Sequence, residues 1–168
     1  MQVVQAASDA GDGKEPQRRA VDRLTRWIRF ELDRQAYGVP VPAVREVVPL
    51  GEVAPIPGAP AEVCGVVNLR GHLVPVICLR RRLGLAERVP DDSTRVILVD
   101  DDDGGATGLR VDSVQQVIDV FEADIEPAPA VGSRRDHGIH GIARDELGPV
   151  TLLEIDALVQ IGDAGVER

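Results

Sequence analysis

One pattern occurs twice in this chain: Tyr37-Gly-Val-Pro-Val-Pro-Ala-Val-Arg-Glu-Val-Val-Pro-Leu50 and Thr107-Gly-Leu-Arg-Val-Asp-Ser-Val-Gln-Gln-Val-Ile-Asp-Val120. The glycine, several aliphatic positions and a polar pair coincide at a constant offset of 70 residues. Both stretches are rich in valine, whose branched Cβ favours strands over helices. The pattern therefore predicts two copies of one β-rich unit.

Shorter matches extend the repeat toward the C-terminus. Gly65-Val66-Val67 corresponds to Gly141-Ile142-Ala143, and Pro75–Leu79 corresponds to Pro149–Leu153, with the offset drifting from 70 to at most 76 residues. We expect two related halves, at about residues 24–85 and 94–160. Because a half of roughly 60 residues is marginally stable alone, the halves should share a core. Short strands of this kind suit five-stranded barrels, so the predicted fold class is all-β, with two tandem barrels and short helices.

Local patterns predict the individual strands. Apolar and other residues alternate from Trp27 to Leu32, a turn is expected at Asp33–Gln35, and a second strand begins at Tyr37–Val41. Four prolines between residues 49 and 60 exclude a helix there. Further strands are predicted at residues 64–69, 73–79, 95–99, 107–111, 116–121 and 149–153, with short helices at residues 79–85 and up to residue 159.

The charge of the chain argues against two classes of partner. It has 28 acidic and 19 basic residues, a formal net charge of −9. Such a surface repels phosphate backbones and anionic lipids, so we expect no nucleic acid partner and no direct membrane insertion. Residues 1–22 are polar and aperiodic, which predicts a disordered tail, and residues 161–168 form a second tail. No apolar signal core is present, which predicts a cytoplasmic protein.

An acidic run, Asp100–Asp103, follows the predicted strand Arg95–Val99, as in phosphate-accepting receiver domains. A receiver needs about 120 residues of alternating strand and helix and a late lysine. No lysine follows Asp103. No register of this segment fits a calcium-binding EF-hand loop either. The run is better interpreted as a solvated hairpin loop before Gly104-Gly105.

Two cysteines and three histidines could be imagined as a metal or catalytic site. Cys64 and Cys78 lie in apolar runs and lack the close spacing of structural zinc ligands, while His137 and His140 lie in a predicted loop. A cysteine paired with His72 has no orienting third residue. We therefore expect core thiols, no metal, no cofactor and no enzymatic activity. A metal- or thiol-dependent enzyme is the alternative from another class, to be distinguished by zinc analysis and thiol titration.

The segment Asn68-Leu69-Arg70-Gly71 lies between two apolar strands and predicts a hairpin tip with Arg70 pointing outward. The second half has Arg144–Gly148 in its place, so the repeat is broken at a surface loop, where specific function tends to lie. Arg80–Arg82 is most simply the solvated face of a short helix, although arginine forks can also bind carboxylates.

Several further motifs occur in a fixed order along the chain: Tyr37-Gly38, Val44–Val47, Pro55–Pro60, Gly65-Val-Val-Asn-Leu-Arg-Gly71, Val74–Ile77, Gly108–Val117 and Leu152–Leu158. In these motifs the sequence resembles the CheW family of chemotaxis coupling proteins, over about residues 26–161. One departure is Cys78, where the family commonly has an acidic residue that would cap the following helix.

The resemblance implies two barrels similar to SH3 domains and a non-enzymatic cytoplasmic adaptor. Its implied partners are the cytoplasmic tip of a methyl-accepting chemoreceptor and the regulatory domain of the histidine kinase CheA, in a membrane-associated array. A coupling protein of a non-motility chemosensory pathway stays open as an alternative. The implied protein-binding residues are Val44, Glu46, Val47, Gly65, Asn68, Arg70, Gly71, Val114 and Val117.

Overall fold

The structure is a computed structural model that describes residues 23–101, 104–128 and 138–160. The two predicted tails, at residues 1–22 and 161–168, lie outside these ranges. The elements in chain order are β2 (Leu24–Leu32), β3 (Gln35–Pro40), η2 (Val41–Ala43), β4 (Val44–Pro49), β5 (Val63–Leu69), β6 (His72–Cys78), α2 (Leu79–Arg82), β7 (Arg95–Asp100), β8 (Ala106–Val111), β9 (Ser113–Phe121), η3 (Glu122–Asp124), β10 (Ile139–Asp145), β11 (Gly148–Leu153) and α3 (Ile155–Leu158).

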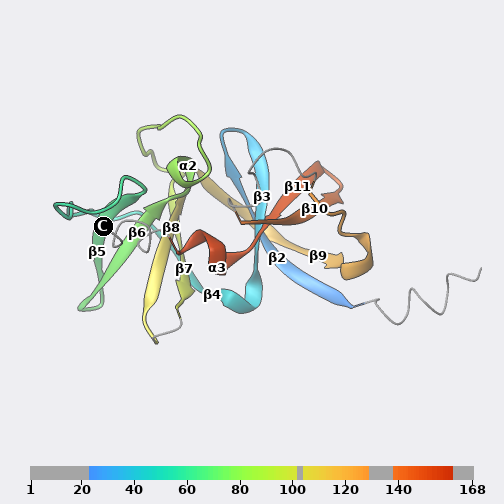
Figure 1. The fold of residues 1–168 in the computed structure, drawn as a ribbon, viewed down its shortest axis with the longest axis horizontal. Coiled ribbons are helices and arrows are strands. Elements are labelled where there is room, and N and C mark those ends of the chain that lie inside the picture. The colour runs from blue at the N-terminus through green and yellow to red at the C-terminus, as the bar shows by residue number, and fades with distance from the viewer. Residues whose placement is uncertain (1–22, 102–103, 129–137, 161–168) are drawn as a thin grey trace, which may run out of the picture.

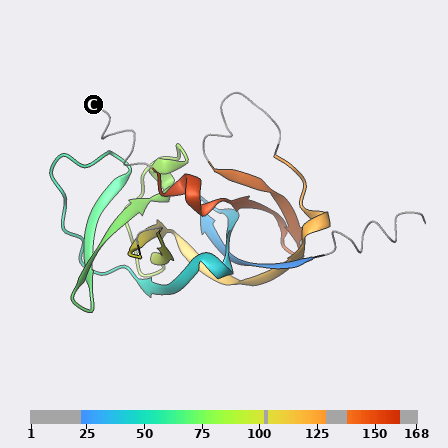
Figure 2. The same ribbon diagram turned by 60° about the horizontal axis from the view of Figure 1, so that its bottom comes forward.

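The strands form two five-stranded sheets, in the orders β10-β11-β3-β2-β9 and β4-β7-β8-β6-β5. The pairs β3–β11 and β6–β8 are parallel, and the other neighbours are antiparallel. The two sheets lie side by side, with α3 between them in both views (Figures 1 and 2). The predicted fold class, two related five-stranded β-barrels with short helices, is confirmed.

The predicted barrel boundaries are wrong. A first barrel at about residues 24–85 and a second at about 94–160 would each use the strands of one sequence half, whereas each sheet takes strands from both halves. One sheet consists of β4 to β8, which are contiguous from Val44 to Val111, and the other joins β2 and β3 to β9, β10 and β11. A sequence repeat shows which elements correspond, but it does not show which of them pair.

Strands that correspond in the sequence repeat also take corresponding positions in the two sheets. The strands β10, β11, β3, β2 and β9 match β5, β6, β8, β7 and β4 in order, so one sheet repeats the pattern of the other. In the β5–β6 hairpin the register shifts at Gly65, and in the β10–β11 hairpin it shifts at the matching residue, Gly141. The residue after each glycine forms an isolated antiparallel β-bridge, Val66 with Ala54 and Ile142 with Glu126.

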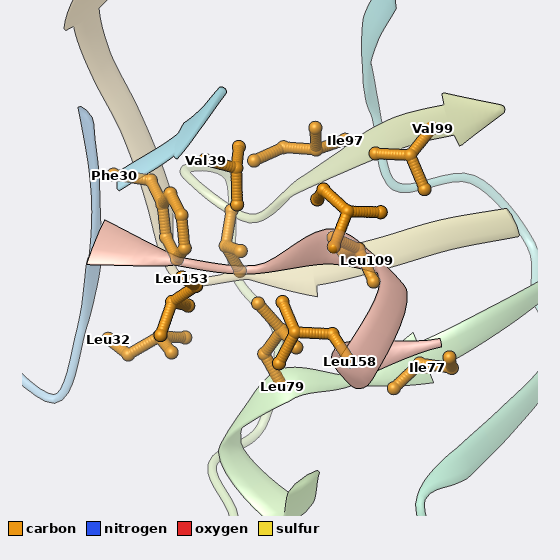
Figure 3. Packing of buried hydrophobic residues seen from close by; sticks show 12 residues of the cluster. Phe30, Leu32, Val39, Ile77, Leu79, Ile97, Val99, Leu109, Leu153 and Leu158 are labelled. Atoms are coloured by element: carbon orange, nitrogen blue, oxygen red, sulfur yellow. The ribbon is translucent and has the colours of Figure 1, made fainter. Parts of the chain in front are cut away.

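The buried side chains form three clusters, one inside each barrel and a central one between them. Trp27 and Leu152 lie inside the barrel of β2, β3, β9, β10 and β11. Val76 and Leu98 lie inside the barrel of β4 to β8. The central cluster draws on β2, β3, β6, β7, β8, β11 and both helices, so the predicted shared core is present (Figure 3). Its buried members are Phe30, Leu32, Val39, Ile77, Leu79, Ile97, Val99, Leu109, Val111, Leu153, Ile155 and Leu158.

The predicted turns form as expected. Asp33 and Arg34 have φ angles of 54° and 65°, and they connect β2 to β3 in a two-residue hairpin turn. Gly84, with φ of 79°, follows helix α2, which ends at Arg82 and is thus shorter than the predicted helix at residues 79–85. The acidic run is a hairpin loop between β7 and β8, closed by a hydrogen bond from Asp101 N–H to Gly105 C=O; Asp102 and Asp103 lie outside the described residues.

Two local predictions are wrong. His140 was expected in a loop but lies in strand β10, while His137 lies outside the described residues. Arg80 was expected on a solvated helix face but is buried, with only 6% of its surface exposed. Its guanidinium makes two hydrogen bonds to the Asp112 carboxylate, of 2.9 and 2.8 Å, and a third to Ala86 C=O. Arg82 Nη2 donates to Ala157 C=O on α3 at 2.9 Å.

Candidate functional site

An exposed ion pair joins two of the predicted binding residues, Arg70 and Glu46. Arg70 Nη2 lies 2.7 Å from Glu46 Oε2 and donates a hydrogen bond to it. Arg70 belongs to the tip of the β5–β6 hairpin and Glu46 to strand β4, so the pair joins the two edge strands of one sheet. The Glu46 carboxylate raises the pKa of Arg70, first through this hydrogen bond and then through its charge.

The turn that carries Arg70 has the geometry predicted from Asn68 and Gly71. Arg70 and Gly71 have φ angles of 53° and 86°, so the turn needs two residues in the left-handed region. Asn68 Oδ1 accepts a hydrogen bond from Gly71 N–H at 3.0 Å and closes the turn. The side chain of Arg70 is 73% exposed. The local turn chemistry therefore places its remaining donors in solvent.

Val44 and Val47 lie beside Glu46 on strand β4. Both are half-buried and pack against the central cluster. The register of β4 against β7 shifts between Val44 and Glu46. Such an irregularity turns side chains that would otherwise alternate between the two faces. The exposed parts of both valines can contact a partner, while their buried parts support the core.

Gly65 has a different position from the other predicted binding residues. It is buried, its φ is 147°, and a Cβ there would lie 2.3 Å from the carbonyl oxygen of Ala54. Only glycine allows the backbone of the Ala54 segment to approach so closely. Gly65 therefore shapes the base of the β5–β6 hairpin and presents no side chain to a partner.

Val114 and Val117 lie on β9, in the other sheet. Strand β9 takes the same edge position there that β4 takes in its own sheet. At the repeat offset, Val114 and Val117 correspond to Val44 and Val47, and Gln116 corresponds to Glu46. Val114 packs against the central cluster, whereas Val117 is 53% exposed. The structure thus brings Arg70 and Glu46 together and puts the β9 valines on a separate, related edge.

A cleft that the sequence did not predict opens beside the start of β2. It encloses about 890 Å³. Its lining residues come from β2, η2, η3, β10 and α3 and include Trp27, His140 and Glu154. The rings of Trp27 and His140 lie with centroids 5.7 Å apart, and His140 Nδ1 is 3.4 Å from Glu154 Oε2. These residues are distant in sequence and meet only because β2 and β10 belong to one sheet, joined through β3 and β11, so no local pattern could have indicated the cleft.

Within residues 23–101, 104–128 and 138–160, no three or more His, Cys, Asp or Glu side chains are grouped as a metal ion would require. Cys64 and Cys78 are both free thiols, Cys64 half-buried and Cys78 buried. As expected from the departure at Cys78, its side chain makes no capping hydrogen bond to helix α2. No helix in the described part of the chain is long and apolar enough to cross a membrane.

Comparison with known proteins identifies relatives along nearly all of the described chain. The chemotaxis protein CheW of Treponema pallidum (strain Nichols) is 32% identical over 144 residues, which cover 82% of this chain and 83% of that protein. CheW of Bacillus subtilis (strain 168) is 33% identical over 135 residues, covering 80% and 86%. The crystal structure of the scaffolding protein TtCheW from Thermoanaerobacter tengcongensis superposes with a TM-score of 0.75 at 32% identity, covering 83% of this chain and 94% of that one.

The family model described as the CheW-like domain matches residues 26–162. This range contains both sheets apart from the first two residues of β2, both short helices, and Arg70 and Glu46. The interleaved strand order and the hairpin that carries Arg70 are thus features of the matched region. The chain belongs to the CheW-like domain family of chemotaxis proteins.

Proposed function

We propose that this protein is a non-enzymatic cytoplasmic adaptor that couples the cytoplasmic tip of a chemoreceptor to the regulatory domain of the histidine kinase CheA. In this proposal it is recruited to membrane-associated receptor arrays by these contacts. Family membership and the likeness to a solved scaffolding protein support an adaptor role. The observation that carries the proposal is the exposed Arg70–Glu46 pair, flanked by half-exposed valines on an edge strand.

The chemistry of this surface suits protein recognition. The Arg70 guanidinium has five N–H donors, and one bond to Glu46 leaves others free to meet a carboxylate or backbone carbonyls of a partner. The bond to Glu46 holds the fork in place, so less side-chain entropy is lost on binding. Val44 and Val47 add apolar area next to this polar anchor. Arginine anchors surrounded by apolar contacts are frequent hot spots in protein interfaces.

The edge strands β4 and β9 give the two sheets comparable surfaces. Each carries two valines at matching positions, but only β4 has a glutamate joined to an arginine at a hairpin tip. We assign the β4 surface to one partner and the exposed Val117 on β9 to a second contact. An adaptor needs two such surfaces, because it must hold two proteins at once.

The test is Arg70→Ala, with Arg45→Ala as the matched control. Arg45 is also an exposed arginine on this sheet, and its Nε donates to Asp100 Oδ1 at 2.7 Å. We expect Arg70→Ala to weaken binding to the kinase regulatory domain or to the receptor tip roughly tenfold to thirtyfold. Arg45→Ala should leave both affinities within about twofold. Binding is measured by titration calorimetry with each purified partner separately.

Thermal unfolding of both variants distinguishes a binding residue from a structural one. Because Arg70 is solvent-facing, its loss should shift the melting temperature no more than the loss of Arg45 does. Unchanged affinity for both partners would remove Arg70 from the interface. A marked drop in melting temperature for Arg70→Ala alone would make the ion pair a support of the barrel. Glu46→Gln then reports whether holding the guanidinium in place matters for affinity.

A further inference from the structure

The two cysteines of the chain are neighbours at the base of the β5–β6 hairpin. Cys64 lies at the shift in register between Val63 and Gly65, and Cys78 is the last residue of β6. Cys78 N–H donates to Glu62 C=O at 2.7 Å, which keeps the end of β6 against the start of β5. The two thiols are close enough to share a hydrogen bond, and both are free. Two thiols that share a hydrogen bond across a hairpin are close enough for one sulfur to attack the other once it is oxidised.

Cationic groups surround this thiol pair. Arg110 Nη1 on β8 lies 3.7 Å from Cys64 Sγ, and the charges of Arg80 and Arg81 on α2 act on Cys78. The hydrogen bond from the Cys64 thiol lowers the pKa of Cys78 against the opposing effect of burial, and the charges of Arg110 and Arg81 also lower it. That hydrogen bond and burial raise the pKa of Cys64. The pair therefore loses its first proton readily, and the thiolate is the nucleophilic form of cysteine.

The hairpin also offers a route to the buried thiol. Strand β5 is the edge strand of its sheet, and Cys64 on it is half-exposed while Cys78 is covered. Opening an edge strand at an irregular point breaks only the local β5–β6 bonds and leaves the rest of the sheet paired. A small oxidant can thus reach Cys78 without unfolding of the barrel.

We propose that Cys64 and Cys78 form a reversible intramolecular disulfide when the protein meets a peroxide. The Cys78 thiolate attacks one oxygen of hydrogen peroxide, the O–O bond breaks, and a sulfenic acid and hydroxide form. The Cys64 sulfur then attacks the sulfenic sulfur, the S–O bond breaks, and the sulfenic oxygen leaves as hydroxide. The two thiol protons convert both hydroxides to water. Two thiols are oxidised, one peroxide is reduced, and a small dithiol restores the starting state.

The disulfide would join β5 covalently to the residue that precedes α2. It would therefore tie the base of the hairpin whose tip carries Arg70 to the helix anchored by Arg80. This inference concerns the purified chain alone and does not depend on the proposed adaptor function.

The experiment treats the folded protein with hydrogen peroxide and measures its intact mass. We expect a loss of about 2 Da, no change in oligomeric state, and full reversal by dithiothreitol. In Cys64→Ser the reaction should stop at the sulfenic acid, which dimedone traps at Cys78. In Cys78→Ser no mass loss should occur, because the sulfur that forms the disulfide with Cys64 is missing. The rate in the wild type should persist below pH 7, where ordinary thiols react slowly.

Other outcomes would overturn the inference. If both thiols stay free under peroxide while the same protein in denaturant is oxidised, Cys64 and Cys78 are inert core residues. Disulfide-linked dimers in place of the mass loss would show that the two thiols do not meet within one chain. Dimedone trapping at Cys64 rather than at Cys78 when the wild-type protein is oxidised would contradict the assigned nucleophile.

Discussion

Arg80 is a buried cation that links three segments of the chain. Its Nε and Nη2 donate to the two carboxylate oxygens of Asp112, between β8 and β9, and its Nη1 donates to Ala86 C=O. Asp33 lies in the turn between β2 and β3, and its Oδ1 is 3.7 Å from Arg80 Nη2. Asp112 also accepts from the backbone N–H of Asp33 at 2.9 Å. Since a buried guanidinium loses its hydration, this set of acceptors has to replace it.

Replacing Asp112 with alanine should destabilise the fold by about 3 kcal/mol, because Arg80 would then be a buried charge without its main partner. Asp119→Ala is the control, since Asp119 also accepts from an arginine, Arg26, but at an exposed position. We expect the control to change the free energy of unfolding by less than about 1 kcal/mol. Denaturant unfolding at pH 7 measures both. Equal effects would show that the Arg80 cluster is not a structural centre.

The Asp112 carboxyl also predicts a pH dependence. Burial would raise its pKa, but the Arg80 hydrogen bonds, the Asp33 N–H and the charges of Arg80 and Arg88 outweigh this and lower it. A lowered pKa in the folded state adds stability that is fully present above the ordinary carboxyl pKa, about 3.9, and is lost as the pH falls through the folded value. The stability difference between wild type and Asp112→Asn should therefore shrink on acidification below about pH 4. A constant difference down to pH 2 would contradict this assignment.

At the residue scale, the sequence predicted what local chemistry determines. The outward position of Arg70 follows from its turn, which Asn68 and Gly71 determine within four residues. The burial of Arg80 could not be predicted in that way, because its partner Asp112 lies 32 residues away. The run of three arginines on a short helix looks the same in sequence whether the helix is solvated or anchored.

The β5–β6 hairpin is the element in which binding and structural residues are most closely mixed. Its tip is open, since a Cβ on Gly71 would meet nothing within 4 Å. At its base, a Cβ on Gly65 would lie 2.3 Å from the Ala54 carbonyl oxygen. Glycines of one motif thus serve different purposes at its two ends.

Gly65→Ala should destabilise the protein by roughly 3 kcal/mol or more, because a left-handed φ and a backbone clash add together. Gly71→Ala, the matched change at the tip, should cost only about 1 kcal/mol of conformational strain. Thermal and denaturant unfolding compare the two variants. If Gly65→Ala were as stable as Gly71→Ala and lost only partner binding, Gly65 would belong to the interface after all.

At the element scale, most strands were predictable from alternation and turn signals, and the exceptions have physical reasons. Strand β10 was not predicted because a stretch rich in glycine and arginine precedes it, although its Gly141 matched Gly65 in the repeat. Strand β4 follows prolines at positions 40 and 42, where the chain forms the 3-10 turn η2 before it extends again. Such a short turn leaves no pattern of its own.

The whole molecule is interleaved. Strands β2 and β3 complete a sheet with β9, β10 and β11, while β7 and β8 complete the sheet of β4, β5 and β6. The repeat in the sequence predicted the number of units and their likeness. The repeat could not predict that each sheet takes strands from both halves. Pairing within a half and pairing between halves would bury the same residues in the same kind of sheet.

Cutting the chain between the sequence halves should therefore leave one folded particle. A protease site inserted after Val89, which is 82% exposed, would be cleaved without loss of any strand. We expect the two pieces to elute together in size-exclusion chromatography and to separate only in denaturant, and each piece alone to lack a cooperative unfolding transition. Two pieces that separate and fold in native buffer would show that each half is an independent domain.

The contiguity of β4 to β8 has a consequence for the order in which the chain can fold during synthesis. The first described strand, β2, pairs with β9, and the contact of Arg26 with Asp119 spans 93 residues. By contrast, every strand of the other sheet is available once Val111 has left the ribosome. The apolar faces of β2 and β3 therefore stay exposed in the nascent chain while the sheet of β4 to β8 forms. Exposed strands are prone to aggregate during this period. Of the described strands, β2 and β3 are made first, yet the sheet they belong to is the last to be completed.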